Sequence, residues 1–116
     1  LIFILVHVAW VAVGRLILHV DTNFYYVAAF TTDSVWKYPV WALFGAGVFS
    51  LFVHFGCIAY DIYKKTNKSI GYALLISVVG VGGYVTWMLI RMYAGELYPI
   101  HVPADYIQMS LPGMQN

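Results

Sequence analysis

Three long apolar runs dominate the pattern of the chain, at residues 1–20, about 38–63 and about 69–93. A helix needs about 20 apolar residues to cross the hydrocarbon core of a bilayer. None of the runs alternates apolar and polar positions in the manner of a strand in a membrane barrel. The pattern therefore predicts an all-α integral membrane protein, with three transmembrane helices in an up-down-up bundle and a single membrane domain covering residues 1–116.

The stretches between the runs predict what lies outside the hydrocarbon. Residues 21–37 are polar, but their aromatic side chains favour a position at the membrane interface. These aromatic residues are Phe24, Tyr25, Tyr26 and Phe30. Residues 64–68 form a tight connector. Residues 94–116 contain three prolines, so we expect a tail that is irregular and lies on the surface.

Composition supports a membrane location and excludes other classes. The chain is 62% hydrophobic and 9% charged, whereas soluble domains carry about 25% charged residues. No basic stripe is present, which argues against a nucleic-acid partner. The single cysteine, Cys57, excludes an internal disulfide and a multi-cysteine metal site. Because the chain begins inside an apolar run without methionine, we expect that a leader was removed or that the first turn is missing.

Lysine asymmetry predicts the orientation of the helices. The connector at residues 64–68 holds three lysines, whereas residues 21–37 hold one lysine and two aspartates. By the positive-inside rule the connector faces the cytoplasm, or the matrix in a mitochondrion, and the tail lies outside.

Histidines within the apolar runs are candidates for function, because ionisable groups are costly inside a membrane. His7 lies about 20 Å along the first run from Val20, and His54 about 24 Å along the second run from Tyr38, at 1.5 Å per residue. The two imidazoles are therefore expected at similar depth, as bis-histidine haem ligation requires. The second ligand can equally come from another subunit, and the alternative is that each histidine hydrogen-bonds a neighbouring helix.

Two further pairs of polar residues flank these histidines. Arg15 and His19 are predicted to share a face near the outer end of the first helix, where Arg15 either snorkels outward or pairs with a haem propionate. Asp61 and Tyr63 lie near the inner end of the second helix. The pattern favours an interfacial belt with Asp61 paired to Lys64 or Lys65, and a quinone pocket is the alternative.

Two helix faces are expected to carry packing. His54, Cys57, Ile58 and Asp61 share one face of the second helix. The third helix presents small residues that predict a seam for another helix, namely Ser77, Gly80, Gly82 and Gly83. No nucleophile triad, phosphate loop or zinc site is present in the sequence, so no catalytic residue is assigned.

The run Ser50-Leu-Phe-Val-His54-Phe-Gly-Cys-Ile-Ala-Tyr-Asp61-Ile-Tyr63 resembles the membrane anchors, or cytochrome b subunits, of succinate:quinone oxidoreductases and quinol:fumarate reductases. The resemblance implies that His54 is an axial ligand of the iron of haem b, and that Asp61 and Tyr63 contribute to a quinone site. It also implies a second membrane anchor and iron–sulfur and flavoprotein subunits as partners. Such an anchor passes electrons between the iron–sulfur subunit and quinone in a bacterial or mitochondrial inner membrane.

The run Val53-His54-Phe-Gly-Cys57-Ile is also similar to the second helix of the small three-helix subunit of haem–copper quinol oxidases. That subunit is structural and binds no cofactor. Its first two helices are joined by a short turn, unlike residues 21–37 here. A third alternative is a structural subunit of a respiratory complex that is specific to one lineage.

Overall fold

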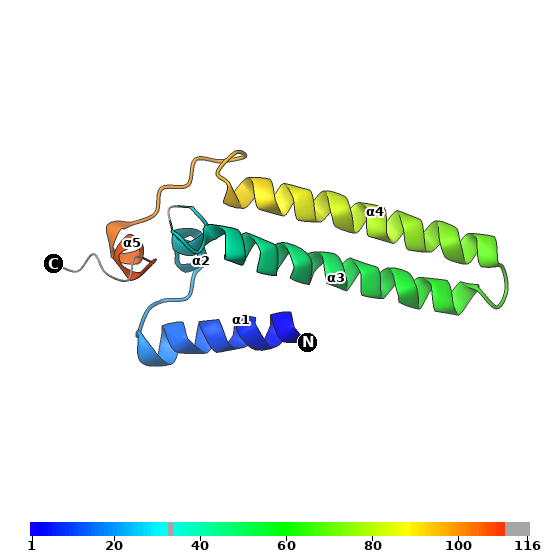
Figure 1. Ribbon diagram of the computed structural model, residues 1–116, viewed down its shortest axis with the longest axis horizontal. Coiled ribbons are helices and arrows are strands. Elements are labelled where there is room, and N and C mark those ends of the chain that lie inside the picture. The colour runs from blue at the N-terminus through cyan, green and yellow to red at the C-terminus, as the bar shows by residue number, and fades with distance from the viewer. Residues whose placement is uncertain (33, 111–116) are drawn as a thin grey trace. The chain divides into compact units, whose positions relative to one another are not determined.

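The computed structural model describes residues 1–32 and 34–110. Every regular element in these residues is helical, in agreement with the predicted all-α class (Figure 1). The elements in chain order are α1 (Ile2–Ala12), the π-helical turn η1 (Val13–Ile17), α2 (Phe24–Thr31), α3 (Lys37–Tyr63), α4 (Lys68–Tyr93) and α5 (Ala104–Ser110). Residues 45–90 form one compact unit, here the hairpin unit, and the described residues before and after them form the aromatic unit.

Helices α3 and α4 confirm the second and third predicted helices. They contain 27 and 26 residues and are the two described helices that are long and apolar enough to cross a membrane. At 1.5 Å per residue each is about 40 Å long, more than the hydrocarbon thickness of about 30 Å. Only 11% and 6% of their apolar stretches are buried inside the chain, which distinguishes them from core helices of a soluble domain.

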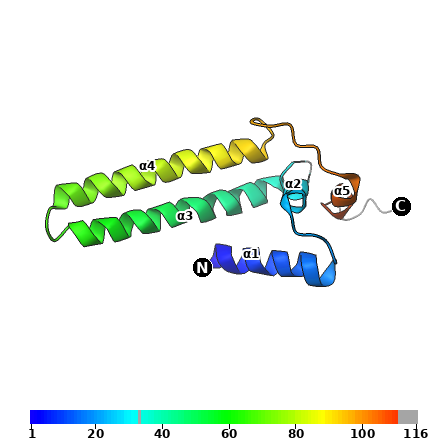
Figure 2. The ribbon, with the colours of Figure 1, turned by 180° about the vertical axis from the view of Figure 1, so that it is seen from behind.

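The hairpin unit holds α3 against α4 through glycines that face large side chains. A Cβ added at Gly82 would lie 2.7 Å from Cγ of Phe52, and one added at Gly56 would lie 3.0 Å from Leu75. The two helices therefore approach closely where these glycines occur. Figures 1 and 2 show α3 and α4 side by side, joined by a short turn. In this turn the side chain of Asn67 accepts hydrogen bonds from the first backbone N–H groups of α4.

The first helix is shorter than predicted. Residues 1–20 were expected to form one span, but α1 and η1 together cover 11 and 5 residues, 16 in all. This length corresponds to about 24 Å in an ideal α-helix. Beyond the helix His19 adopts a left-handed conformation with φ 53°, and the N–H of Val20 donates to the carbonyl of Gly14 over 2.9 Å. The third membrane span is thus not confirmed.

Close packing against α2 accompanies the π-helical turn. Gly14 is buried, and a Cβ at this position would lie 2.9 Å from both Thr22 and the Tyr26 ring, so a larger residue would push α2 away. The hydroxyl of Tyr26 donates to the carbonyl of Trp10 over 3.4 Å. The same carbonyl also accepts from the backbone N–H of Val13, the first residue of the π turn, so the Tyr26 hydroxyl joins α2 to the helix just before that turn.

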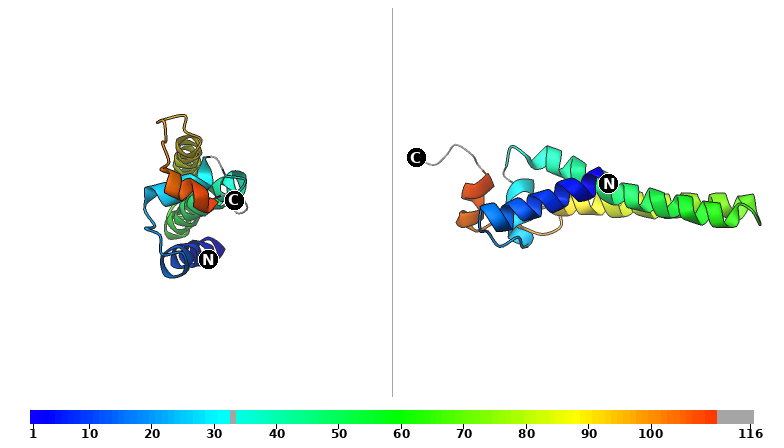
Figure 3. Two further views of the ribbon diagram at one scale, coloured as in Figure 1. Left: turned by 90° about the vertical axis from the view of Figure 1, so that its left-hand side faces the viewer. Right: turned by 90° about the horizontal axis from the view of Figure 1, so that it is seen from below.

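Two short helices occupy segments for which no helix was predicted. Helix α2 gathers the aromatic residues of the segment 21–37, and Asn23 caps it by accepting from the N–H groups of Tyr25 and Tyr26. Helix α5 lies in the tail, so the prediction of an irregular tail is wrong at Ala104–Ser110; residues 111–116 lie outside the described part. The two helices pack together in both views of Figure 3, where the Asn23 amide donates to the Tyr106 hydroxyl over 3.0 Å.

Candidate functional site

His7 lies within a cluster of aromatic rings in the aromatic unit. Its imidazole stacks on Phe3, with ring centroids 5.7 Å apart, and meets the edge of Phe44 at the same distance. Trp10 and Tyr93 also pack edge-on against Phe44. The imidazole is therefore half-buried and held between aromatic rings, which restricts its rotation.

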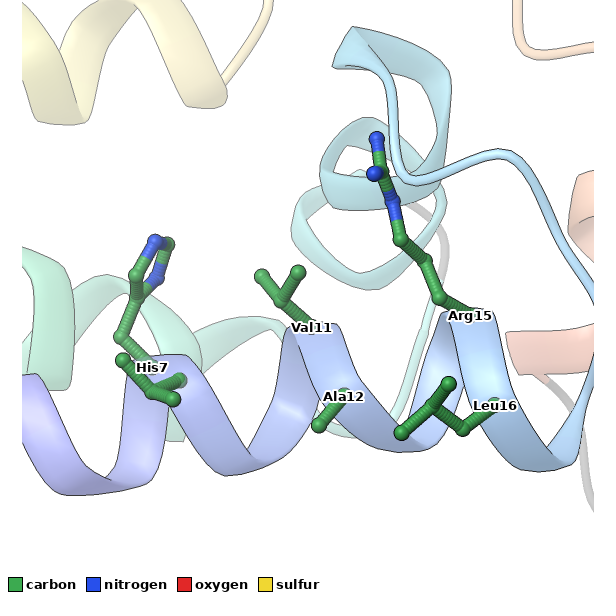
Figure 4. Close-up of a pocket in the computed structure, with 6 residues that line it drawn as sticks. His7, Val11, Ala12, Arg15 and Leu16 are labelled. Atoms are coloured by element: carbon green, nitrogen blue, oxygen red, sulfur yellow. The ribbon is translucent and has the colours of Figure 1, made fainter.

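A hollow of about 430 Å³ follows the same side of the first helix (Figure 4). Its lining residues are His7, Val8, Val11, Ala12, Arg15 and Leu16. In a regular α-helix, positions eight apart are rotated by about 80°, which would separate residues 7 and 15. The π turn holds more residues per turn and brings Arg15 round, so that His7, Val11 and Arg15 rise from one side of the helix.

The hollow combines an apolar surface with two nitrogen-bearing side chains. Its volume lies within the range of about 300–1,000 Å³ that is common for small-molecule sites. Arg15 uses its Nε–H to donate to the Thr22 hydroxyl over 2.7 Å, and its terminal N–H groups have no partner among the described residues. An amphipathic ligand with an acidic group fits these features, because a guanidinium can bind a carboxylate through two hydrogen bonds.

His54 has a different environment, in the hairpin unit. Positions 52 and 56 of α3 face α4, and His54 lies two residues from each, about 200° round the helix. The side chain is exposed, as are its neighbours Leu51, Phe55 and Ile58. Its ring is 6.5 Å from that of Phe55, and it makes no hydrogen bond to any described residue.

The C-terminal end of α3 carries the predicted ion pair. The Lys64 ammonium lies 2.5 Å from a carboxylate oxygen of Asp61, which confirms the expected pairing. The hydrogen bond to Asp61 raises the pKa of Lys64, and the ammonium also lies 5.5 Å from the ring centre of Tyr60. Tyr63 is half exposed and its hydroxyl makes no hydrogen bond within the described chain. A quinone site at these residues stays a prediction.

The prediction that Arg15 and His19 share a helix face is wrong. Arg15 lies in η1, whereas His19 follows the end of that helix in a left-handed turn. The i, i+4 spacing aligns two side chains only within a continuous helix, and the helix ends at Ile17. Because His7 belongs to the aromatic unit and His54 to the hairpin unit, their equal depth stays a prediction.

The predicted small-residue seam of α4 divides into two faces. Gly82 packs against Phe52 of α3, whereas no atom comes within 4 Å of a Cβ added at Gly80 or Gly83. Ser77 is exposed as well. One glycine thus joins the hairpin, and the other small residues leave an open surface.

Sequence reasoning missed a cavity of about 250 Å³ in the aromatic unit. Its lining comes from three segments, with Thr31, Thr32, Lys37, Trp41, Tyr93, Ala94, Gly95 and Ile100 contributing. No linear motif joins residues so far apart in the chain. The only signal was that Lys37 stands between Trp36 and Tyr38, the composition of a membrane interface.

Within the described residues, no three His, Cys, Asp or Glu side chains gather as ligands for a metal ion. Haem ligation needs only one or two histidines from a chain, so this finding does not bear on it. The sequence matches no family model, no curated protein and no solved structure.

Proposed function

We propose that this chain is a membrane anchor subunit of a respiratory succinate dehydrogenase or fumarate reductase. In this role it helps to bind haem b and quinone, and electrons pass through its site between the iron–sulfur subunit and the quinone pool. It holds the iron–sulfur and flavoprotein subunits at the membrane together with a second anchor. Succinate oxidation itself belongs to the flavoprotein subunit, so this chain is an electron-transfer subunit and not the catalytic one.

The environment of His54 carries the proposal. Its imidazole lies on an apolar, exposed face within a helix long enough to cross a membrane. A polar group placed in hydrocarbon without a hydrogen bond costs several kcal/mol, roughly 2–7, and the described chain supplies no partner. A partner from outside the described residues would remove this cost, and the iron of haem b binds an imidazole nitrogen directly.

Other side chains fit a haem as well. His7 would supply an imidazole in the aromatic unit, and Arg15 would neutralise a propionate at the far end of the apolar hollow. The small residues Gly47 and Ser50 precede His54 by seven and four positions on its helix face, which suits the approach of a flat ring. Bound haem would supply a one-electron carrier at either of these two places, and the residues of that unit would hold it and set its orientation.

The test is the visible spectrum of the purified complex after His54→Leu. Loss of a b-type band, or conversion of a low-spin haem to a high-spin one, is expected because an axial nitrogen is removed. His101→Leu is the matched control, since His101 lies outside the helices in an exposed position. An unchanged spectrum in a fully assembled His54→Leu complex would rule the ligand out. His7→Leu and His19→Leu test the remaining histidines in the same way.

We also propose that Asp61 and Tyr63 form part of the quinone site. A carboxylate and a phenol can serve the carbonyl oxygen of quinone and its proton, and Tyr63 has a hydroxyl with no internal partner. Asp61→Asn and Tyr63→Phe should each lower quinone-linked turnover by about tenfold, or 1.4 kcal/mol, while reduction of a soluble dye by succinate survives. Unchanged quinone turnover in both variants would overturn this proposal. Asp61 would then serve only in the ion pair with Lys64, and Tyr63 only as an interfacial aromatic side chain.

The topology that accompanies this function has three spans. Residues 1–17 would form the shorter first span, with residues 64–68 inside and the tail outside a bacterial or mitochondrial inner membrane. Thr66→Cys and Gln108→Cys place a thiol at an exposed position on each side. A membrane-impermeant reagent added outside should label only Gln108→Cys, and labelling of Thr66→Cys alone would reverse the orientation.

The alternative is a cofactor-free structural subunit of a haem–copper quinol oxidase or another respiratory complex. The Asp61–Lys64 ion pair favours it, because a carboxylate already paired with an exposed lysine is typical of an interfacial belt. The subunits that copurify separate the two readings. Flavin and iron–sulfur partners support the anchor, and a copper-containing partner supports the alternative.

A further inference from the structure

The formal charge of the hairpin unit is gathered at one end. Within residues 45–90 the acidic and basic side chains are Asp61, Lys64, Lys65 and Lys68, which stand together around the turn between α3 and α4 (Figure 1). Three lysines against one aspartate leave a net charge of +2 at this turn. The apolar stretches of the two helices are mostly unburied, so the turn is the part of this unit that attracts an anionic partner.

Contacts between the two helices fix the shape of the turn. The ring centroids of Tyr60 and Tyr72 lie 4.9 Å apart, and a Cβ added at Gly71 would lie 3.0 Å from the Tyr60 ring. The backbone N–H of Lys64 donates to the Tyr60 carbonyl over 2.8 Å, and the Asn67 side chain caps α4. The lysines around the turn are therefore carried on an ordered backbone.

Two of the three lysines at the turn keep an unpaired charge. Lys64 is neutralised by Asp61 and lies near the ring of Tyr60. Lys65 and Lys68 are exposed, and their ammonium groups form neither an ion pair nor a hydrogen bond with any described residue. Because the single aspartate of the unit is already engaged, these two ammonium groups are available to an anion from outside the chain.

Exposed apolar and aromatic side chains next to these lysines favour a membrane over an acidic protein surface. Ile62 and Ile70 are 64% and 47% exposed, and Tyr63 and Tyr72 are about half exposed. All four lie on the helix turns that flank the charged turn. A lipid leaflet offers hydrocarbon to the isoleucines, a polar boundary to the tyrosine rings and anionic headgroups to the lysines, in the order in which the helices present them.

We propose that Lys65 and Lys68 bind the headgroups of anionic phospholipids where the hairpin reaches the membrane surface. A lysine close to an anionic leaflet contributes about fivefold in affinity, and its alkyl stem lets the ammonium reach a phosphate from the end of a helix. Helices α3 and α4 are each about 40 Å long, about 10 Å more than the hydrocarbon thickness, which allows the turn to extend into the headgroup layer. The proposal does not depend on haem, on quinone or on the side of the membrane that the turn faces.

The test uses a fluorescent probe on Thr66→Cys in the full chain, with the exposed Cys57 replaced by serine, in vesicles of phosphatidylcholine with one-fifth phosphatidylglycerol. Quenching by a small fraction of spin-labelled lipid with either headgroup gives the preference of the turn for phosphatidylglycerol. This preference should be several-fold with all lysines present. It should fall by about two- to fivefold in Lys65→Gln and in Lys68→Gln. The arginine variants at both positions should keep it, because the charge is kept.

Lys37→Gln is the matched control for net charge, because it removes a lysine from the other end of α3. Ser69→Gln introduces the same amide at an exposed position beside the turn. Both variants should keep the preference, and circular dichroism checks that each variant is helical. Equal quenching by the two lipids with all lysines present, or an equal fall in Lys37→Gln and Lys65→Gln, overturns the proposal.

Two further measurements separate other anionic partners from lipid. Loss of the preference in millimolar inorganic phosphate at constant ionic strength would indicate a site for free phosphate. Loss of the preference in the assembled complex would indicate an acidic subunit over the turn. Either result overturns the lipid assignment, whereas a preference that persists in both conditions supports it.

Discussion

The two units of this molecule are stabilised in different ways. The aromatic unit buries large side chains among themselves, with Tyr26, Phe44 and Tyr93 all less than 10% exposed, and side-chain hydrogen bonds fix its short helices. The hairpin unit is held by glycines that face single large residues, and most of its side chains point away from the chain. Helix α1 of the first unit nevertheless buries none of its residues and exposes most of its apolar side chains. The second leaves most of its apolar side chains on outer faces, and His54 lies on one of those faces.

The largest expected effect contrasts two phenylalanines of α3. Phe44 contacts Phe3, His7 and Trp10, so Phe44→Ala should lower the free energy of unfolding in mixed micelles by about 3–5 kcal/mol. Phe55 is 52% exposed, and Phe55→Ala should change it by less than about 0.5 kcal/mol, as for other surface positions. Equal losses in the two variants would remove the distinction between the units.

The next largest effect on stability is expected at two glycines of α4. Gly82→Ala forces a Cβ against Phe52, and overpacking of this kind typically costs about 1–3 kcal/mol. Gly83→Ala meets open space and should leave the isolated chain as stable or more so, since alanine favours a helix by up to about 1 kcal/mol. If Gly83→Ala lowers the stability only of an assembled complex, a partner helix covers that face.

The smallest effect is a pH dependence in the aromatic unit. Burial raises the pKa of Tyr26 above its unfolded value of about 10. The neutral phenol is therefore favoured in the folded state. Its contribution is fully present below pH about 10 and is lost as the pH rises through the folded pKa. The free energy of unfolding should therefore fall as the pH rises from about 9 to about 11, around the ordinary tyrosine pKa. In Tyr26→Phe this fall should be less steep. Tyr98→Phe, which alters an exposed ring, should keep the original slope.

The extent to which sequence predicts this structure differs between the same two units. The boundaries of α3 and α4 follow from hydropathy, because a long apolar run with few breaks has no stable alternative to a helix in lipid. The Asp61–Lys64 pair was predictable for a similar reason, since spacing within one helix fixes which side chains are neighbours. Both predictions depend on local geometry.

Predictions failed where tertiary contacts decide the local structure. Hydropathy alone continues the first helix to Val20, but the packing of Gly14 against Tyr26 and the hydrogen bond from Arg15 to Thr22 accompany a π turn and an early end. The cavity lined by Lys37 and Tyr93 could not be predicted at all, because these residues are far apart in the chain and no spacing rule connects them. Helix α5 of the tail contacts α2, and hydropathy along the chain does not reveal such a contact.

That contact has a consequence for biosynthesis. Asn23 and Tyr106 are 83 positions apart, so their hydrogen bond can form only after α3 and α4 have left the ribosome. During this interval the surface of α2 that later meets α5 remains open to chaperones, to the insertion machinery or to a premature partner. Folding during synthesis generally begins with the N-terminal part of a chain, so α2 emerges well before α5 can dock on it. A nascent chain that ends before residue 104 would therefore lack the segment that contacts α2, a state in which crosslinking can identify the proteins that cover α2 meanwhile.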